Sequence, residues 1–317
     1  MAFCISLWMS GDMQKTLLKP IEIQGVGLHS GLKANVVLKP SPPNTGITFK
    51  RVDQDSKKNV IKASYKNVSS AKLCTKIENS FGVSVSTIEH LMAAFYGEGI
   101  DNALVEVDNS EIPIMDGSAN VFVQSIRTAG IEKQNVSRKF IEVLKKIEIV
   151  DGSKLMSIEP TKKDFKIDFK LVYENELIGT QREILNVSKD NLETIYNSRT
   201  FCLYEDIEKI RSCGMGKGGS LDNAIVVQGN KILNDHGLRY KNEFVKHKIL
   251  DCMGDFMLSG HRVFGFIKCI HGGHQLTNEL LNKFFADSSN WKFVSSDKEY
   301  LESPKYYNYN RPIAVNA

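Results

Sequence analysis

The hydrophobic and polar positions of one stretch separate onto two faces. The stretch "KHKILDCMGDF" runs from Lys246 to Phe256, within a segment, 242–259, whose pattern predicts a helix. At about 100° per residue, its apolar side predicts contact with a core, and its polar side is either a solvated face or part of a site. The apolar side holds Ile249, Leu250, Met253, Phe256 and Met257, and the opposite side holds His247, Asp251 and Asp255.

The first half of the chain alternates short strands with two helices. Runs such as "ANVVLKP" and "GITFKRVD" alternate apolar and polar residues between clusters of Pro, Asn and Gly, which is typical of strands joined by turns. The stretch "SVSTIEHLMAAFYGEG" predicts a helix that ends at Gly97 or Gly99. A strand, "IDNALVEVDN", and a second helix, "GSANVFVQSIRTAG", follow and complete one α+β unit.

A similar order of elements returns after the periodicity lapses at 131–139. Strands are predicted in "KFIEVLKKIEIVDG", "KLMSIEP" and "FKIDFKLVY", followed by the helix 242–259, the strand "RVFGFIKCI" and a helix at about 276–285. We therefore predict an α+β fold with two similar domains, each a sheet packed with helices in a layered sandwich. Domain I is expected at 14–135 and domain II at 136–290.

Other segments do not fit this repeated order. We expect small inserts in both domains, at about 43–72 and 196–228, a disordered N-terminal extension at 1–13 and a C-terminal tail at 291–317. The second insert is rich in apolar residues around the glycine-rich "GMGKGGS". "GMGKGG" has the spacing of a dinucleotide fingerprint, but it follows a helix-like stretch rather than a strand, so a lid or groove edge is the better interpretation.

Composition narrows the class of protein. The 317 residues are 42% hydrophobic and 25% charged, which is typical of a globular chain. The 41 Lys and Arg residues nearly balance 37 Asp and Glu, and we expect no nucleic-acid partner. The six cysteines form no CxxC pair, and neither a secretory signal nor a membrane-spanning run is apparent, so a cytoplasmic protein is expected.

Two separated motifs supply candidate ligands for a metal ion. His247 and Asp251 stand at i and i+4, so both side chains can reach one ion from adjacent helical turns. A catalytic zinc site needs a third protein ligand, and His90 in "STIEHL" is a candidate, with Glu89 beside it. Ser86 and Glu89 also match a capping box, so the local pattern leaves Glu89 open between a catalytic and a structural role.

A third patch, "CIHGGHQLTNELL", places His274 just before a predicted helix. A histidine there can act as a general acid if a carboxylate keeps it protonated, and Asp255 is a plausible partner. A loop histidine is more often a surface residue, so this pattern alone leaves both roles open.

Several stretches taken together resemble one enzyme family. They are "GVGLHSG", "STIEHLMAA", "EIPIMDGSA", "SRTF", "GGSLDNAIV", "NEFVKHKILDCMGD" and "GGH". In this order, from about Gln14 to Phe285, they resemble the zinc-dependent UDP-3-O-acyl-N-acetylglucosamine deacetylases, which carry out the first committed step of lipid A synthesis in Gram-negative bacteria. The resemblance implies two α+β domains with the active site between them.

The resemblance also implies a role for each matching residue. It implies zinc bound by His90, His247 and Asp251, with Glu89 as the general base and His274 as the general acid supported by Asp255. Thr200 is expected to hydrogen-bond the oxyanion, Phe201 to pack on the sugar and Lys248 to meet the diphosphate. The remaining substrate contacts are expected at His29, Leu203, Ile207, Gly219, Ser220 and Val226, with the second insert forming a passage for the acyl chain.

The expected substrate is UDP-3-O-acyl-N-acetylglucosamine, and the expected enzyme is a monomer whose substrate allows peripheral contact with the inner membrane. Two alternatives stay open at this point. One is a zinc amidohydrolase that acts on another N-acyl substrate. The other is a noncatalytic binding protein with the same fold. The presence of every expected site residue argues against this second alternative.

Overall fold

The computed structural model describes residues 12–295 of the chain. The predicted extension at 1–13 lies outside the described residues except for its last two, and Met13 begins strand β1. The predicted tail at 291–317 starts with strand β20 (Trp291–Ser295), which pairs with β11 (Lys139–Val143), and the rest of it lies outside the described residues.

A five-stranded sheet forms the outer layer of the first half. Its strands are β2 (Ile21–Val26), β3 (Lys33–Pro40), β4 (Ile47–Arg51), β5 (Val60–Lys62) and β9 (Ala103–Val107). Their order is β2-β3-β9-β4-β5, and only β4 and β9 run parallel. The range 43–72, expected as an insert, thus contributes β4 and β5 to this sheet, because Ile47 and Phe49 are buried on its inner face.

A seven-stranded sheet forms the outer layer of the second half. Its strands are β11, β12 (Ile147–Asp151), β13 (Lys154–Glu159), β14 (Phe165–Val172), β15 (Thr180–Asn186), β19 (Arg262–Ile270) and β20. The long strand β19 pairs with β13 along one edge and with β14 and then β11 along the other. The predicted strands of domain II thus meet around β19.

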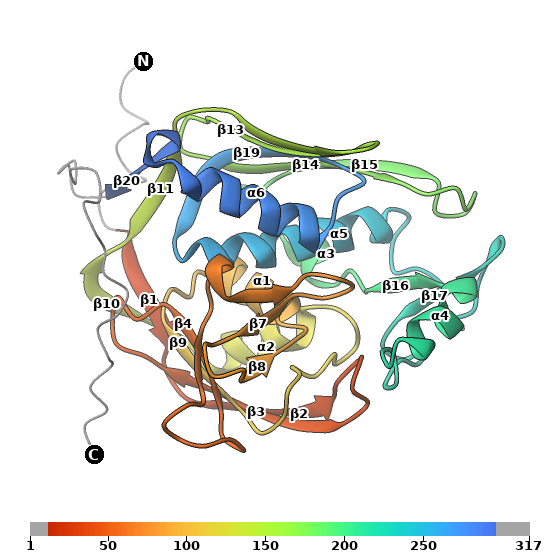
Figure 1. Ribbon diagram of the computed structural model, residues 1–317, viewed down its shortest axis with the longest axis horizontal. Coiled ribbons are helices and arrows are strands. Elements are labelled where there is room, and N and C mark those ends of the chain that lie inside the picture. The colour runs from red at the N-terminus through yellow and green to blue at the C-terminus, as the bar shows by residue number, and fades with distance from the viewer. Residues whose placement is uncertain (1–11, 296–317) are drawn as a thin grey trace.

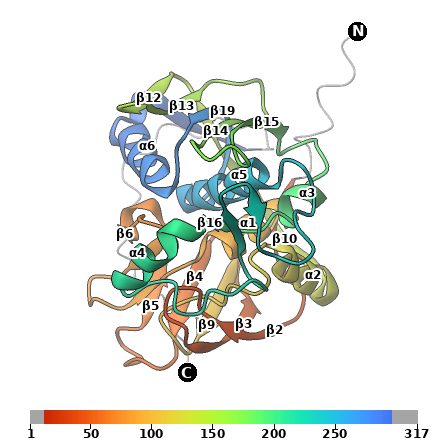
Figure 2. The same ribbon diagram turned by 90° about the vertical axis from the view of Figure 1, so that its right-hand side faces the viewer.

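Six α-helices lie within residues 12–295. They are α1 (Glu89–Glu98), α2 (Asn120–Ala129), α3 (Glu193–Tyr196), α4 (Ile207–Ser212), α5 (Glu243–Phe256) and α6 (His274–Ala286). Short 3-10 turns are η1 (Tyr65–Asn67), η2 (Tyr204–Asp206), η3 (Met257–Ser259) and η4 (Ser288–Asn290). Figures 1 and 2 show α5 and α6 under the seven-stranded sheet and α1 and α2 over the five-stranded sheet, so two helical layers meet in the middle. The predicted α+β layered sandwich is confirmed.

Three small sheets complete the described chain. β1 (Met13–Leu17) pairs with β10 (Ile131–Ser137), and the expected domain boundary near residue 135 falls inside β10. β6 (Val68–Ser70), β7 (Lys76–Glu78) and β8 (Ser84–Val85) form the second small sheet. β16 (Phe201–Leu203), β17 (Ile225–Gln228) and β18 (Lys231–Ile232) form the third and, with α4, stand out from the layers in Figure 1.

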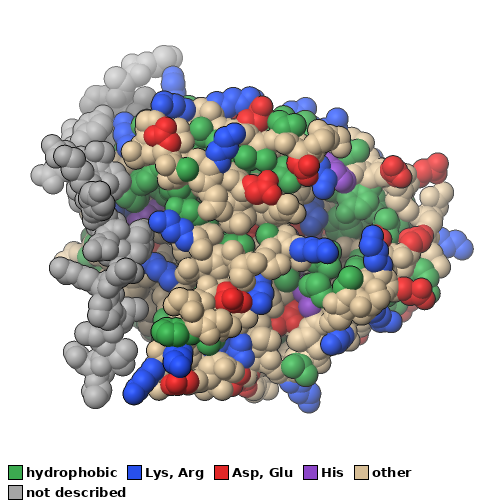
Figure 3. All heavy atoms as spheres, in the orientation of Figure 1, with side chains coloured by type: hydrophobic (Ala, Val, Ile, Leu, Met, Phe, Trp, Pro, Cys, Tyr) green, Lys and Arg blue, Asp and Glu red, His purple; other side chains and the backbone are tan. Residues whose placement is uncertain are grey.

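Charged side chains of both signs are spread over the face seen in Figure 3. Hydrophobic side chains gather toward the right of this face, where Figure 1 places the far end of β15 and the small sheet of β16 to β18. Within residues 12–295, no helix is long and apolar enough to cross a membrane.

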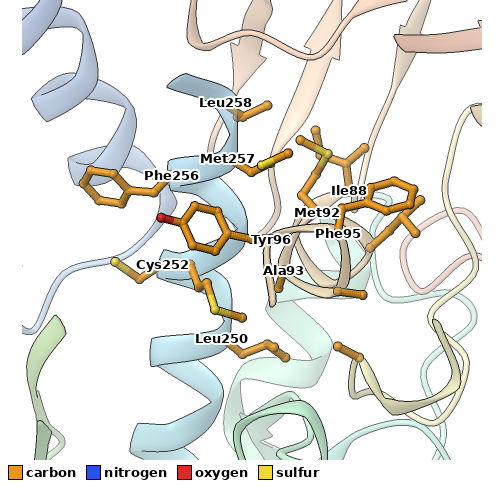
Figure 4. Close-up of a cluster of buried hydrophobic side chains, with 14 of the residues drawn as sticks. Ile88, Met92, Ala93, Phe95, Tyr96, Leu250, Cys252, Phe256, Met257 and Leu258 are labelled. Atoms are coloured by element: carbon orange, nitrogen blue, oxygen red, sulfur yellow. The ribbon is translucent and has the colours of Figure 1, made fainter. Parts of the chain in front are cut away.

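The contact between α1 and α5 is the closest approach of the two helical layers. Figure 4 shows Ala93 and Tyr96 of α1 directed toward the part of α5 that carries Leu250 and Cys252. All four side chains are at most 2% exposed. At the crossing, a Cβ atom on Gly254 would lie only 2.0 Å from the backbone oxygen of Glu89. The absence of a side chain at position 254 therefore permits this packing.

We expect Gly254→Ala to lower the free energy of unfolding by about 3 kcal/mol, because its methyl group meets helix backbone that cannot rotate away. Urea denaturation measures this change. The matched control is Gly229→Ala, at a left-handed position with φ 54° and open space around it, where about 1 kcal/mol is expected. Equal losses in the two variants would contradict the close helix contact.

Candidate metal centre

The polar side of α5 is buried. His247 is 2% exposed, and Asp251 and Asp255 are each 4% exposed. The interpretation of this side as a solvated face is therefore wrong. Since α5 lies between its own sheet and α1, both of its sides face protein, and buried polar groups of this kind need partners.

The three predicted ligands meet at the contact of α1 with α5. These are His90, His247 and Asp251, which together are called the metal-ligand group. Each offers a ligand atom, and these atoms lie within 4.8 Å of one another. Oδ1 of Asp251 lies 3.5 Å from Nε2 of His90 and 3.4 Å from Nε2 of His247. Tetrahedral zinc with bonds of about 2.0–2.1 Å separates its ligand atoms by about 3.3 Å. The two distances from Asp251 fit such an ion.

The hydrogen bonds of these side chains leave Nε2 of His247 and Oδ1 of Asp251 free to bind a cation. Nδ1 of His247 donates to the backbone oxygen of Ser198 over 3.0 Å, which leaves Nε2 with a lone pair. Oδ2 of Asp251 accepts from Nζ of Lys248 over 2.9 Å. Oδ1 of Asp251 is buried and has no hydrogen-bond donor among the described residues. An anionic oxygen without a donor is costly unless a cation binds it.

Burial and charge set the protonation of these ligands. Burial is the main cause that lowers the pKa of His247, to about 3. Burial alone would raise the pKa of Asp251, but the nearby charges, including the Lys248 ammonium, outweigh it and bring that pKa well below its usual range. A neutral imidazole and an ionised carboxylate are the forms that bind a metal ion.

Glu89 is not part of a capping box. Ile88 occupies the N-cap position of α1 without a side-chain hydrogen bond, and the hydroxyl of Ser86 donates to the backbone of Ser110. The Glu89 side chain is 4% exposed, and its Oε2 accepts from the backbone N–H of Thr75 over 3.1 Å. Burial is the main cause that raises the pKa of Glu89. The capping interpretation is therefore wrong, and the carboxylate faces the metal-ligand group.

His274 is the first residue of α6, two residues earlier than the predicted helix start, and is only 8% exposed. Its Nδ1 lies 2.7 Å from Oδ2 of Asp255, and its Nε2 lies 3.8 Å from Oε1 of Glu89. Burial alone would lower the pKa of His274, but the carboxylates of Asp255 and Glu89 outweigh it and raise that pKa to about 10. The surface interpretation is wrong, and the imidazole is held in its charged form.

Phe201 and Lys248 adjoin the metal-ligand group, and Thr200 is the residue before Phe201. Nζ of Lys248 lies 5.6 Å from the ring centre of Phe201, and the rings of Phe201 and His247 are 6.4 Å apart. Thr200 precedes Phe201 and is fixed by its backbone, which donates to Gly117 and accepts from Ile225, each over 2.8 Å. An aromatic face and a cation therefore stand next to the candidate metal centre.

His29 lies in the loop between β2 and β3. Both of its ring nitrogens are buried without a hydrogen-bond partner among the described residues. Burial is the main cause that lowers the pKa of His29, and the charge of His274 lowers it further although Glu111 opposes both. His29 is thus near enough to His274 for the charge of one ring to act on the other.

The other expected substrate contacts lie in the second insert. Leu203 is in β16, Ile207 begins α4, and Val226 is in β17, so they surround one small sheet. Leu203 and Ile207 are half-buried, whereas Val226 is buried. Gly219 and Ser220 belong to the loop between α4 and β17, where the Ser220 N–H donates to the Asn223 side chain. Within residues 12–295, no hydrogen bond, ion pair or ring contact joins any of the five to the metal-ligand group.

Comparison with known proteins agrees with this geometry. The sequence profile of the UDP-3-O-acyl N-acetylglycosamine deacetylase family matches residues 14–286. The chain belongs to this family. A protein of Idiomarina loihiensis named UDP-3-O-acyl-N-acetylglucosamine deacetylase is 42% identical over 294 residues, 92% of this chain and 95% of the relative. A protein of the same name from Histophilus somni is 44% identical over 93% of this chain and 96% of the relative. Another from Haemophilus influenzae is 42% identical over 91% of this chain and 95% of the relative.

Family membership makes the chain an enzyme, a deacetylase of the hydrolase class. The matched range also contains the motif of His90 and the motif of His247 and Asp251, so the metal-ligand group takes residues from both of its halves. The resemblance inferred from the quoted motifs is thereby confirmed.

Sequence reasoning missed several residues that hold the site together. Thr75 contacts Glu89, Asp255 and His274 from a loop without a recognisable motif. Ser198 orients His247 through its backbone oxygen, which no side-chain pattern reveals. Buried Glu111 accepts from the backbone of His29 and Ser30 and from the Thr87 hydroxyl, over distances of 2.7–2.8 Å. Its place in "EIPIMDGSA", a quoted motif, was the available signal.

We expect the purified protein to hold about one zinc ion per chain. His247→Ala should weaken zinc binding at least about 100-fold, because the two remaining protein donors cannot hold a tetrahedral ion firmly. Metal analysis after dialysis against a zinc buffer measures this loss. The control is His261→Ala, a half-buried histidine packed on Phe293 and outside the ligand group, which should keep its zinc. Zinc retained by His247→Ala would reject the ligand set.

Proposed function

We propose that this chain hydrolyses the acetamide of UDP-3-O-acyl-N-acetylglucosamine to give UDP-3-O-acyl-glucosamine and acetate. The observation that carries this proposal is the 3.8 Å separation of Oε1 of Glu89 and Nε2 of His274 beside the ligand group of His90, His247 and Asp251. A proton acceptor and a proton donor thus adjoin three metal ligands. The relatives described above are named for this deacetylation.

Zinc is the proposed cofactor, and His90, His247 and Asp251 are its proposed ligands. Two imidazoles and one carboxylate suit zinc, and three protein ligands leave a fourth position open, as in catalytic zinc sites. When bound, zinc would polarise the acetamide carbonyl and lower the pKa of a water molecule toward about 7. The Asp251 oxygen that lacks a donor supports this assignment.

Glu89 is the proposed general base. Its carboxylate takes a proton from the attacking water, and burial raises its pKa, so it holds that proton better than an exposed glutamate does. The N–H of Thr75 fixes Oε2, which leaves Oε1 on the side of His274. The hydroxyl of Thr200 is the proposed donor to the oxyanion that forms when the carbonyl carbon becomes tetrahedral.

His274 is the proposed general acid. The tetrahedral intermediate must expel an amine, which leaves poorly unless it is protonated. The Nδ1 proton of His274 is directed to Asp255, so Nε2 carries the proton that the amine receives. Asp255 keeps the imidazole charged through its own negative charge and fixes the direction of the ring.

The proposed substrate contacts surround this centre. Phe201 packs on the sugar, and Lys248 meets the diphosphate. Lys248 is 23% exposed at its side chain and forms an ion pair with Asp251, so a metal ion on Asp251 would release the ammonium toward the nucleotide. The acyl chain is proposed to follow the insert along Leu203, Ile207 and Val226, with Gly219, Ser220 and His29 at its entrance.

The reaction also suggests a cellular setting. We place it in the cytoplasm, where nucleotide sugars are made, as the first committed step of lipid A synthesis. We propose a monomer. We also propose that it has no nucleic-acid partner, since the charge balance is nearly even. The acyl chain of the substrate allows peripheral contact of the enzyme with the inner membrane.

We expect the zinc-loaded protein to release acetate from UDP-3-O-acyl-N-acetylglucosamine, and Glu89→Gln to lower kcat about 10²–10⁴-fold while it keeps its zinc. The control is Glu78→Gln in β7, whose carboxylate pairs with Lys76 and should leave kcat unchanged. A fully active Glu89→Gln enzyme would assign the base elsewhere. Acetate release only from other N-acyl substrates would favour the alternative amidohydrolase.

A pH profile tests His274. Its pKa in the folded protein is raised to about 10, so the acid form is present at neutral pH and is lost as pH rises through that value. We expect kcat/KM to fall on the alkaline side in the wild-type enzyme, and this limb to disappear in His274→Gln, whose kcat is about 10²–10³-fold lower. An unchanged alkaline limb in the variant would identify a different acid.

A further inference from the structure

Thr75 contacts three groups of the proposed mechanism at once. It lies in the loop between β6 and β7 and is 2% exposed. Its backbone N–H donates to Oε2 of Glu89 over 3.1 Å. Its hydroxyl donates to Oδ1 of Asp255 over 2.6 Å and lies 3.2 Å from Nδ1 of His274. One residue from the first half thus contacts the proposed base on α1, the proposed acid on α6 and the carboxylate on α5 that pairs with this acid.

The hydroxyl determines how Asp255 is held. Its proton points to Oδ1, while Oδ2 faces Nδ1 of His274 at 2.7 Å, so the carboxylate is fixed at both oxygens. Among the described residues, no other side chain donates to Oδ1. The Nδ1 proton of His274 has Oδ2 as its near acceptor and the Thr75 oxygen as a weaker second one. Without the hydroxyl, Asp255 and the His274 ring are free to turn.

The backbone before Thr75 is strained. Leu73 has a left-handed conformation, with φ 70°, although its side chain is 49% exposed and gains little from burial. Non-glycine residues adopt this conformation only where surrounding contacts impose it. The contacts of Thr75, two residues later, are buried and can impose it. The loop that carries Thr75 thus contains a backbone conformation that is uncommon for residues other than glycine.

We infer that Thr75 is a positioning residue that aligns the general acid His274 with the general base Glu89 through its hydroxyl and its N–H. This inference rests on the proposed deacetylation. The N–H fixes the carboxylate of Glu89, and the hydroxyl fixes Asp255 and thereby His274. Because both bonds come from one residue, the separation of the acid and the base depends on the place of Thr75 and not only on the packing of α1 against α5.

Thr75→Val removes the hydroxyl at nearly constant shape. We expect kcat for acetate release to fall about 10- to 100-fold, because misplaced catalytic groups lose this much rate, with KM and zinc content unchanged. Thr75→Ser keeps the hydroxyl and should restore kcat to within about 3-fold of the wild type. The control is Thr16→Val in β1, which removes a buried hydroxyl bonded to Asn102 and Ser41 and should leave kcat unchanged. Wild-type kcat in Thr75→Val would overturn the inference.

A double-variant cycle tests whether Thr75 acts through His274. In a His274→Gln background, Thr75→Val should lower kcat less than about 3-fold, since the acid that it positions is already absent. The same fold-loss in both backgrounds would mean that Thr75 acts independently of His274, which contradicts the inference.

A proton NMR measurement separates this inference from the reaction itself. The hydrogen-bonded Nδ1 proton of His274 is identified in zinc-loaded protein by its absence in His274→Gln. We expect it to exchange with water at least about 10-fold faster in Thr75→Val than in the wild type or Thr75→Ser. Equal exchange rates in the three proteins would refute the positioning role, whether or not the wild-type protein releases acetate. Failure of the wild-type protein to release acetate would reject the proposed function instead.

Discussion

The site depends on the close contact of α1 and α5. His90 lies on α1, and His247 and Asp251 lie on α5, so the distance between the helices determines whether the three ligand atoms meet. Gly254 allows this distance, since any side chain there would collide with the backbone of Glu89. The residue that permits the packing therefore touches the first turn of α1, which carries both the proposed base and a ligand.

A second constraint is the balance of charge inside the interface. Asp251, Asp255 and Glu89 are all buried there, and each has a specific compensation. Lys248 pairs with Asp251, His274 pairs with Asp255, and the Thr75 N–H bonds to Glu89. The remaining free oxygen of Asp251 faces the two ligand imidazoles. The polar groups are thus satisfied in a way that leaves one cation position.

The insert of the second half also touches the first half. The N–H of Gly218 donates to the backbone oxygen of Leu28 over 3.0 Å, and that of Lys217 donates to His29 over 3.3 Å. A Cβ atom on Gly218 would lie 2.2 Å from the backbone oxygen of Gly27. These bonds join the glycine-rich loop to the loop of His29, so the insert of the second half is anchored on the first half.

The sequence by itself determined most of the elements, the α+β class, and the ligand candidates, because helical periodicity, strand alternation and ligand spacing are local properties. It did not place β4 and β5 in the main sheet, since the pairing of β4 with β9 joins residues far apart in the chain. It also left Glu89 open between cap and base. Only the tertiary structure ruled out the cap, by burying the carboxylate and turning Ser86 toward Ser110. Thr75 had no signal at all, because its role comes from contacts with residues up to 199 positions away.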